Sequence, residues 1–314
     1  MFQRILVPLD GSFRAEQALP VAARIARATG GSLLLVQVVS PPLDYSGGLA
    51  PVPLMNEQVI ESEMAAATDS LTAIAASWVQ AGIPTSTEVQ FGFPAQQLIA
   101  TAEAHGIELI VLCSHGRTGF TRWALGSVAH TLVHQSMVPV LVLRESEAAS
   151  LLPRPNEPRT LRALVPLDGS PLAEAALTPA AHLVAALAAP VHGALHLAQV
   201  VKPFSTTVAE GFVSELNEEA RQRASTYLTT VVQRLQATEN ALALSITSQI
   251  LLEADVASAL LTLAEQDGEG GSDLITISTH GRGGLERWMM GSVTERLLSA
   301  TKLPILIVRP SKKG

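Results

Sequence analysis

The 314-residue sequence has little of several features that identify common classes of protein. It holds one cysteine, Cys113, which excludes an intramolecular disulfide framework and fits a reducing compartment. Charged residues make up 16% of the chain and the formal net charge is −7, so broad nucleic-acid binding, which needs a basic face, is not expected. The hydrophobic share of 47% is typical of a globular protein with a sizeable core.

Long uninterrupted apolar runs are also missing. The longest apolar tract, Leu183–Val201, is broken by a proline, a glycine and two histidines, whereas a membrane span needs about 20 continuous apolar residues. We interpret this tract as the end of a helix, a turn and a strand. The first apolar run of the chain is short and is closed by Pro8 and Asp10, so we expect no signal peptide and a cytoplasmic location.

What the chain does contain is an internal repeat. The segment ILVPLDGS at 5–12 returns as ALVPLDGS at 163–170, and a block that begins CSHGRTGF at 113 returns as STHGRGGL at 278. The order of the matches is preserved, which indicates a tandem duplication. We predict two domains, 1–146 and 160–311, joined by a Pro-rich polar linker at 147–159.

Within each copy, short apolar runs alternate with helical patterns. The first copy predicts strands over 5–9, 33–39, 85–91, 108–112 and 138–143, and helices over 13–29, 56–81, 95–105 and 127–135. The second copy repeats this order, with its long helix near 214–236 and a small Gly-rich insertion near 269–271. Such alternation predicts a parallel sheet with helices on both faces and ligands beyond the carboxyl ends of the strands.

An aspartate follows the first strand of each copy, as Asp10 and Asp168. A carboxylate at that place can accept a hydrogen bond from a ligand amine, such as the exocyclic amine of adenine. The alternative is that Asp-Gly-Ser only forms a turn and caps the next helix. Both interpretations stay open at this point.

A glycine-bearing loop follows the fourth strand of each copy. Gly116 and Gly281 permit a positive φ or close backbone approach, and the helix after each loop begins with Gly-Ser, which suits phosphate. The alternative is a Gly-rich connection with solvated arginines. The sequence contains no Gly-x-x-x-x-Gly-Lys-Ser/Thr, and no Gly-x-Gly-x-x-Gly follows the first strand, so neither a P-loop nor a dinucleotide fold is indicated.

Together these residues resemble the universal stress protein family over nearly all of both copies. The resemblance implies an α/β fold of two tandem five-stranded parallel-sheet sandwiches, adenine nucleotide α-hydrolase-like with flavodoxin-type layering. Many members of that family bind ATP through a Gly-x-x-Gly, nine-residue spacer, Gly-Ser/Thr signature. Its second glycine matches Gly116 and Gly281, and nine residues separate each from Gly126 and Gly291.

The resemblance therefore implies two sites for adenine nucleotide, ATP with Mg²⁺, and no cofactor for catalysis. Asp10 and Asp168 match the aspartate on the adenine side, and Val38 and Val200 match the valine beside the base. The predicted site residues are Pro8, Leu9, Asp10, Val38, Cys113, His115, Gly116, Arg117, Gly126, Ser127 and Val128 in the first copy, and Pro166, Leu167, Asp168, Val200, Ser278, His280, Gly281, Arg282, Gly291, Ser292 and Val293 in the second.

The sequence departs from the family signature at its first glycine, which is Cys113 in one copy and Ser278 in the other. A Cβ there weakens binding if the backbone has to approach the ligand closely. The resemblance thus leaves three functions to weigh: an ATP-binding, non-enzymatic stress-response protein, a nucleotide-free interaction scaffold, and a slow ATP hydrolase. The first is favoured, because no repeated acid other than Asp10 and Asp168 stands near the loops to assist hydrolysis.

Several remaining residues have more than one interpretation. Cys113 is expected to be a buried residue at a strand end rather than a redox-sensitive thiol. His130 and His134 have a spacing that metal sites use, yet Glu295 and Ser299 replace them in the second copy, and no metal site is predicted. His115 and His280 either contact phosphate or brace the turn. The family's dimers commonly pair through their last strands, so the apolar stretches 138–143 and 303–308 predict a homodimer or a pseudo-dimer within one chain.

Overall fold

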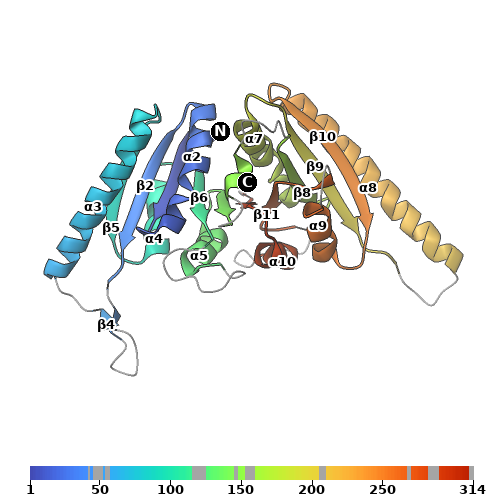
Figure 1. Cartoon of the computed structure of the whole chain (residues 1–314). Coiled ribbons are helices and arrows are strands. Elements are labelled where there is room, and N and C mark those ends of the chain that lie inside the picture. Colours follow the sequence, from blue (N-terminus) through green and yellow to red (C-terminus); the bar gives the residue numbers. More distant parts are fainter. Residues whose placement is uncertain are drawn as a thin grey trace. The chain divides into compact units, whose positions relative to one another are not determined.

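The computed structural model describes residues 1–41, 43–44, 52–53, 57–114, 125–144, 148–152, 160–204, 210–266, 270–281 and 290–310. The chain divides into two compact units, Met1–Glu145 and Ser146–Gly314. Each unit is an α/β domain built on a five-stranded parallel sheet (Figure 1).

In the first unit the strands lie in the order β5-β2-β1-β6-β7, and every neighbouring pair is parallel. The chain therefore winds outward from β1 in one direction, returns, and winds outward in the other, which places the reversal of strand order between β1 and β6. The strands are β1 (Arg4–Leu9), β2 (Ser32–Val39), β5 (Thr85–Phe91), β6 (Leu109–Cys113) and β7 (Val140–Leu143), with a short antiparallel pair of β3 (Leu43–Asp44) and β4 (Val52–Pro53) after β2.

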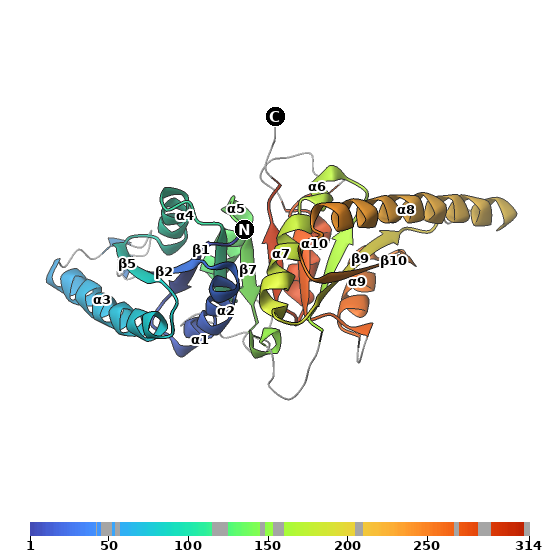
Figure 2. The same cartoon turned by 90° about the horizontal axis from the view of Figure 1, so that it is seen from above.

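Helices cover both faces of this sheet. α2 packs on β1 and β2 and α3 on β2 and β5, while α4 and α5 pack against each other on the opposite face (Figure 2). This is the arrangement that right-handed crossovers require for the observed strand order. The helices are α1 (Phe13–Glu16), α2 (Leu19–Thr29), α3 (Glu57–Gln80), α4 (Pro94–Ala104) and α5 (Ser127–Gln135).

The second unit repeats this plan, with the strand order β10-β9-β8-β11-β12 and parallel pairing throughout. α7 and α8 pack on the β8–β9–β10 side, α9 packs on β9, and α10 packs on α9. The elements are β8 (Arg162–Leu167), α6 (Pro171–Glu174), α7 (Leu177–Ala188), β9 (Gly193–Val201), α8 (Glu210–Thr238), β10 (Leu244–Leu252), α9 (Val256–Ala264), β11 (Leu274–Ser278), α10 (Ser292–Ala300) and β12 (Ile305–Val308).

The predicted fold class is confirmed, and its physical cause is visible in the central strands. Every residue of β6 and of β11 is buried, as expected for strands covered by helices on both faces. The outer strands β5 and β10 instead keep partly exposed polar residues. A fully buried Leu, Ile or Val contributes roughly 1.5–3 kcal/mol relative to exposure, so these central strands hold each sheet together.

The predicted helix over 13–29 is wrong in one respect, because it is broken into α1 and α2. Pro20 lies in the first turn of α2, where its missing N–H is tolerated, but its ring would clash with the carbonyl four residues earlier if α1 continued as one straight helix. Pro179 imposes the same break between α6 and α7 in the second unit. The predicted stop at Gly30 is confirmed by its left-handed φ of 64°.

Two segments predicted as loop or linker contain structure. The loop after β2 holds the β3–β4 pair, and the linker stretch 147–159 holds a 3-10 turn, Ala148–Leu151. Leu151 is fully buried, so this part of the linker packs against the protein instead of running through solvent. The pattern missed this turn because an isolated Leu-Leu pair has no periodicity.

The apolar tract Leu183–Val201 is confirmed as a helix end, a turn and a strand, since α7 ends at Ala188 and β9 begins at Gly193. The described part of the chain has one stretch, Pro171–Ala188, whose length and composition alone would allow a membrane span. It is 61% buried inside the protein and consists of α6 and α7, which is the pattern of a core helix.

A proline near the carboxyl end of β1, and of β8 in the second unit, limits how far the sheet is paired at the reversal of strand order. Arg4 accepts from the Glu108 amide through its carbonyl, so alternate residues of β1, including Pro8, face β6. Pro8 has no N–H to donate, and the β1–β6 register consists of Ile5↔Leu109 and Leu6↔Ile110.

The second unit repeats this device. Arg162 accepts from the Asp273 amide, Pro166 stands four residues on, and the β8–β11 register consists of Leu274↔Ala163 and Ile275↔Leu164. Toward β9, by contrast, β8 is paired along its whole length. The carboxyl ends of the two strands at each reversal are therefore left for loops, which is where ligands bind in sheets of this kind.

Candidate functional site: paired loops at the carboxyl ends of two strands

The turn after β1 is built on Asp10. Its Oδ1 accepts the Ser12 amide at 3.0 Å and the Ser12 hydroxyl at 2.6 Å, across Gly11 with a φ of +77°. Ser12 Oγ in turn accepts the Ala15 amide at 3.2 Å and so begins α1. The interpretation of Asp-Gly-Ser as a turn and helix cap is therefore confirmed for the first unit.

The turn after β8 has the same geometry. Asp168 Oδ1 accepts the Ser170 amide at 2.9 Å and the Ser170 hydroxyl at 2.6 Å, and Gly169 has a φ of 84°. Ser170 Oγ accepts the Ala173 amide at 3.2 Å at the start of α6. In both units the hydrogen bonds of this turn go to Oδ1 of the aspartate.

The second loop of each site ends in a glycine that begins a helix. Gly126 donates its amide to the Ser114 carbonyl and Gly291 donates to the Thr279 carbonyl, both at 2.8 Å. These bonds tie the start of α5 to the end of β6 and the start of α10 to the end of β11. A glycine N-cap has no side chain to accept the first amides of the helix, so those N–H groups are offered to another acceptor.

The glycine at 291 has no conformational cause in the described structure. Its φ is −63°, which any residue adopts, and a Cβ built on it would meet its nearest atom, the Thr279 carbonyl oxygen, at 3.4 Å. Such a distance is an ordinary contact. The absence of a side chain here is instead what a ligand approaching the helix start would require.

Gly281 differs, because a protein atom explains it. A Cβ on residue 281 would lie 2.2 Å from Asp168 Oδ2 and 3.1 Å from its Cγ. The loop after β11 and the turn after β8 therefore meet at these two residues. The structure thus brings together the two predicted halves of the second-copy site, the aspartate and the loop glycine.

Beside Gly281, the end of β11 is held by polar contacts. Thr294 of α10 donates its hydroxyl to the Ser278 carbonyl at 3.0 Å, and His280 Nδ1 lies 2.8 Å from the Thr279 hydroxyl. His280 Nε2 is buried and has no hydrogen-bond partner among the described residues. One nitrogen of His280 thus braces the turn, and the other is left for a group that the described chain does not supply.

The remaining predicted site residues are placed as follows. Leu9 is the last residue of β1 and Asp10 follows it, and both lie near Val38 of β2 because Leu9 pairs with Gln37 in the register. Cys113 is buried at the last position of β6, as predicted, and Ser278 is buried at the last position of β11. Also in the described structure, Pro8, Val38, Val200, Val128 and Val293 are half-buried, Pro166 and Leu167 are buried, and Ser127 and Ser292 are exposed. His115, Gly116, Arg117 and Arg282 lie outside the described residues.

The sequence reasoning missed a polar cluster in the second unit. Arg234 of α8 binds Glu174 of α6, one turn after the Asp168 loop, and Tyr227 of α8 lies beside them. Burial raises the pKa of the Tyr227 hydroxyl, and the charges of Glu174 and Asp168 raise it further. In the first unit the position that corresponds to Tyr227 is the exposed Ser70, because each residue stands directly before a buried leucine, Leu228 on α8 and Leu71 on α3. The two units therefore differ at this position. Neither motif nor periodicity marks Tyr227.

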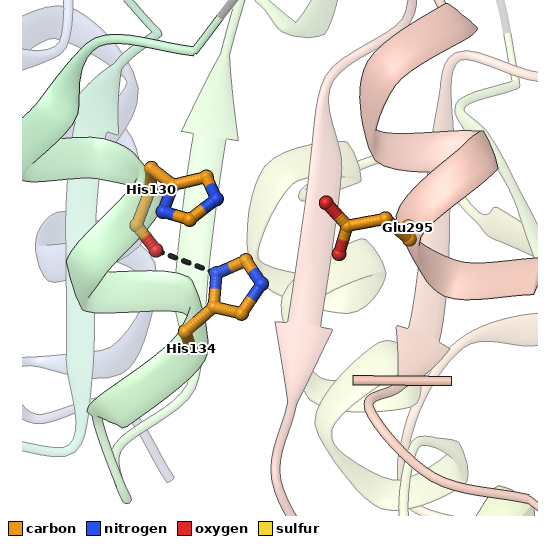
Figure 3. Close-up of side chains that lie close together, drawn as sticks. All are labelled: His130, His134 and Glu295. Carbon is orange, nitrogen blue, oxygen red and sulfur yellow. Dashed lines mark hydrogen bonds between the residues drawn. The ribbon is translucent and has the colours of Figure 1, made fainter. Parts of the chain in front are cut away.

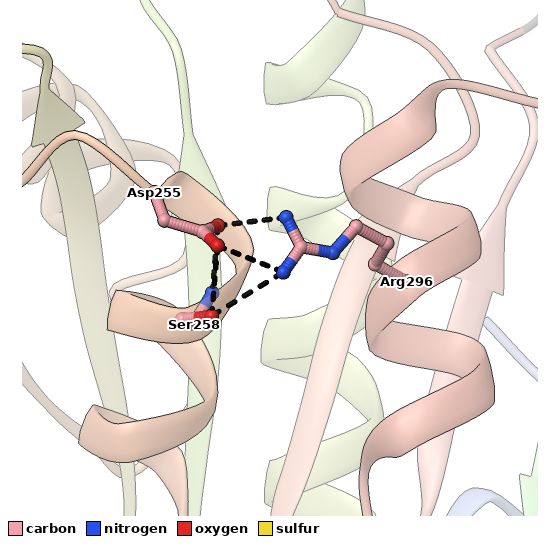
Figure 4. Close-up of polar contacts among 3 residues, drawn as sticks. All are labelled: Asp255, Ser258 and Arg296. Atoms are coloured by element: carbon pink, nitrogen blue, oxygen red, sulfur yellow. Dashed lines mark hydrogen bonds and ion pairs between the residues drawn. The ribbon is translucent and has the colours of Figure 1, made fainter.

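A second feature of the second unit fixes the helix that begins at Gly291. Arg296 of α10 forms a two-bond ion pair with Asp255, the N-cap of α9, and also donates to Ser258 (Figure 4). Hydrogen bonds from Arg296, and then from Ser258, hold the pKa of the Asp255 carboxyl below its usual range. The N-cap of α4 in the first unit is Phe93, which cannot form this pair.

The profile of the universal stress protein family matches residues 1–144 and again residues 160–309. The chain belongs to the universal stress protein family. This is a stress-response family, and the tandem match agrees with the duplication seen in the sequence and in the two sheets.

Individual relatives support the same conclusion. The universal stress protein Rv2005c of Mycobacterium tuberculosis is 25% identical over 324 residues, which cover 98% of this chain and 97% of that protein. The universal stress protein MJ0531 of Methanocaldococcus jannaschii is 29% identical over 151 residues, 46% of this chain and 84% of that protein. Among solved structures, a universal stress protein from Archaeoglobus fulgidus matches with a TM-score of 0.66 at 20% identity, covering 99% of this chain and all of that one. That likeness shows the fold, which is the universal stress protein fold in two repeats.

Proposed function

We propose that this universal stress protein binds adenine nucleotide, ATP with Mg²⁺, at the paired loops of one or both repeats. In this proposal it acts in the cytoplasm as a non-enzymatic regulator whose nucleotide favours one conformation or one partner. A nucleotide can do so only if it binds the two states with different affinities. The apolar last strands of the repeats would pair, within one chain or between two.

The observation that carries the proposal is the meeting of two loops at the reversal of strand order in the second unit, where Gly281 lies against Asp168. One loop presents an aspartate directly after its strand, and the other presents a helix start with a glycine N-cap. A carboxylate oxygen suits the exocyclic amine of adenine, and uncapped helix amides suit phosphate. The lack of any conformational reason for Gly291 supports the phosphate end in particular.

Cys113 and Ser278, at the first position of the signature, decide whether a side chain there blocks nucleotide. Cys113 and Ser278 are both buried at strand ends, and the Ser278 carbonyl is engaged by Thr294. Each small side chain is therefore accommodated within its own strand end. We propose on this basis that neither substitution by itself closes the site.

Equilibrium dialysis of the full chain with labelled ATP and Mg²⁺ tests the proposal. We expect saturable binding of one or two nucleotides per chain, weakened at least tenfold in Gly126→Ala for the first site and Gly291→Ala for the second. Gly211→Ala, in α8, is the matched control and should bind as the parent does. Nucleotide released when the undialysed protein is denatured would add independent support.

A nucleotide-free interaction scaffold is the alternative, and the side chains of Cys113 and Ser278 favour it. Absence of saturable binding to any adenine nucleotide would select the scaffold and reject our proposal. A slow hydrolase is distinguished by turnover above background. If turnover occurs and is abolished by Asp10→Asn together with Asp168→Asn, the non-enzymatic part of the proposal is wrong.

A further inference from the structure

Strand β10 is the outermost strand of the second sheet (Figure 1), and in the part of the chain that the structure describes it pairs with β9 alone. Its sequence is LSITSQILL, and its register with β9 is regular over all nine residues. An edge strand offers unpaired backbone groups to another chain, and proteins commonly protect such an edge with charged residues, proline or a bulge. β10 contains none of these, so nothing within the strand opposes pairing.

The main chain shows which residues of β10 face that edge. The carbonyl of Ala243, just before β10, accepts an amide of β9, and the amide of Glu253, just after it, donates to a carbonyl of β9. The N–H and C=O of one residue point to the same side of a strand, and the side alternates from residue to residue. Odd-numbered residues of β10 therefore face β9. The backbone groups that face the edge are those of Ile246, Ser248 and Ile250.

β10 is also complementary to itself in the antiparallel direction. In an antiparallel pair of two copies centred on Ser248, Ile246 lies opposite Ile250. Leu244 then lies opposite Leu252, and both apolar pairs are on one face of the sheet. The residues that face the edge are opposite one another in this register, which gives about six ladder hydrogen bonds from three residue pairs. Apolar cross-strand pairs stabilise such a ladder further.

The edge strand of the first sheet, β5, differs in the residue that decides this pairing. Its sequence is TSTEVQF, with Glu88 at the centre. An antiparallel pair centred there would place two carboxylates directly opposite each other, which is destabilising. In β10 the uncharged Gln249 takes the place of Glu88, by the registers of the two strands with β2 and β9. The charge that protects the first edge is thus missing from the second.

We propose that two copies of this chain associate through antiparallel pairing of their β10 strands, centred on Ser248. The second-repeat sheets of the two copies then form one continuous sheet about a twofold axis. The partner is a second copy, because β10 is complementary to itself and carries no charge that would repel an identical strand. This surface is distinct from the last strands, since β10 and β12 stand at opposite ends of the strand order of the second unit, and it does not depend on nucleotide.

Cross-linking of cysteine substitutions in the full chain tests the register. The native Cys113 is buried, so a short bis-maleimide reports on the introduced cysteine. Ser248→Cys lies on the proposed twofold axis, where the two thiols meet, and should cross-link efficiently. Ser245→Cys is the matched control, because it also replaces an exposed serine of β10. The two copies of residue 245 would stand about 20 Å apart, so this variant should cross-link at least about tenfold more slowly.

Charge at residue 248 tests the interface without cross-linking. Ser248→Glu and Ser248→Lys should each sediment as a smaller assembly than the parent, because like charges then oppose each other. Mixing the two variants should restore the parental assembly, and circular dichroism checks that both are folded. Equal cross-linking of the two cysteine variants would overturn the proposal. So would equal size of the parent and the Ser248→Glu variant, whether both are monomeric or both associate through another surface.

Discussion

Asp168 and Gly281 lie in direct contact across the reversal of strand order in the second unit, so close that a Cβ on residue 281 would stand 2.2 Å from Asp168 Oδ2. A side chain at residue 281 would therefore displace this carboxylate, whatever else approaches the loop. Among the residues that the structure describes, Gly291 has no such neighbour, since a Cβ there would meet its nearest atom at 3.4 Å. The two glycines of this signature are thus explained by different neighbours, and we expect alanine at the two positions to change stability by different amounts.

The first prediction compares alanine at these two glycines. Gly281→Ala should lower the free energy of unfolding of the second unit by about 1–3 kcal/mol, because Asp168 must move away from its turn. Gly291→Ala should cost about 1 kcal/mol or less, the usual difference between glycine and alanine at an N-cap. Urea titration followed by circular dichroism measures both, and equal losses would contradict the assigned contact.

The second prediction separates the turn from the charge at Asp168. Asp168→Asn keeps an oxygen that can accept the Ser170 amide and hydroxyl, so we expect little change in stability. Asp168→Ala loses both bonds and should cost about 1–2 kcal/mol. If thermal unfolding moves equally in the two variants, the hydrogen bonds to Ser170 are not what stabilises this turn.

The third prediction concerns acid stability and the Arg296–Asp255 pair. The pKa of Asp255 is lowered in the folded protein, so its contribution is present above the unfolded pKa of about 3.9 and is lost as the pH falls through the folded pKa. Arg296→Ala should therefore reduce the loss of stability between about pH 5 and pH 2. Arg221→Ala, an exposed arginine on α8, is the matched control and should leave the acid limb unchanged.

The fourth prediction is a pH dependence closer to neutrality. Burial lowers the pKa of His196, a bond with Gln249 opposes this, and the charge of Arg162 lowers it further. The neutral ring is thus favoured in the fold, and its contribution is full above the unfolded pKa of about 6.5 and lost as the pH falls toward the folded value. His196→Gln should flatten the decline in stability below pH 6.5. If the stability of the variant declines with pH as that of the parent does, groups other than His196 cause the decline.

Much of the fold could be predicted from the sequence because the central strands are mostly apolar and each pattern occurs twice, once in each repeat. Thr85–Phe91 and Ser127–Gln135 have the bounds that the pattern predicts. The break between α1 and α2 was missed because Pro20 stands inside the first turn of a helix, where proline is also favoured. Local rules alone do not say whether such a proline begins a helix or continues one.

The site was predictable where chemistry and spacing coincide and unpredictable where tertiary contacts decide. Asp168 and Gly281 were each identified, but their contact joins residues far apart in the chain and leaves no local pattern. The same holds for Tyr227, which reaches Asp168 electrostatically from a long helix. For His130 and His134 the spacing was visible, whereas the stacking of their rings and the hydrogen bond from His134 Nδ1 to the His130 carbonyl appear only in three dimensions (Figure 3).

Pro8 and Pro166 lack a backbone N–H, so the separation of β1 from β6, and of β8 from β11, at their carboxyl ends is a property of the main chain. A substitution at a neighbouring position does not supply the missing N–H. While the prolines remain, the two strands therefore cannot pair along their full length. The separation of the strand ends therefore does not depend on which side chains lie nearby. After the duplication, the two copies could accumulate differences such as Ser70 against Tyr227, or Cys113 against Ser278, while each retained the same architectural gap in its hydrogen-bond ladder.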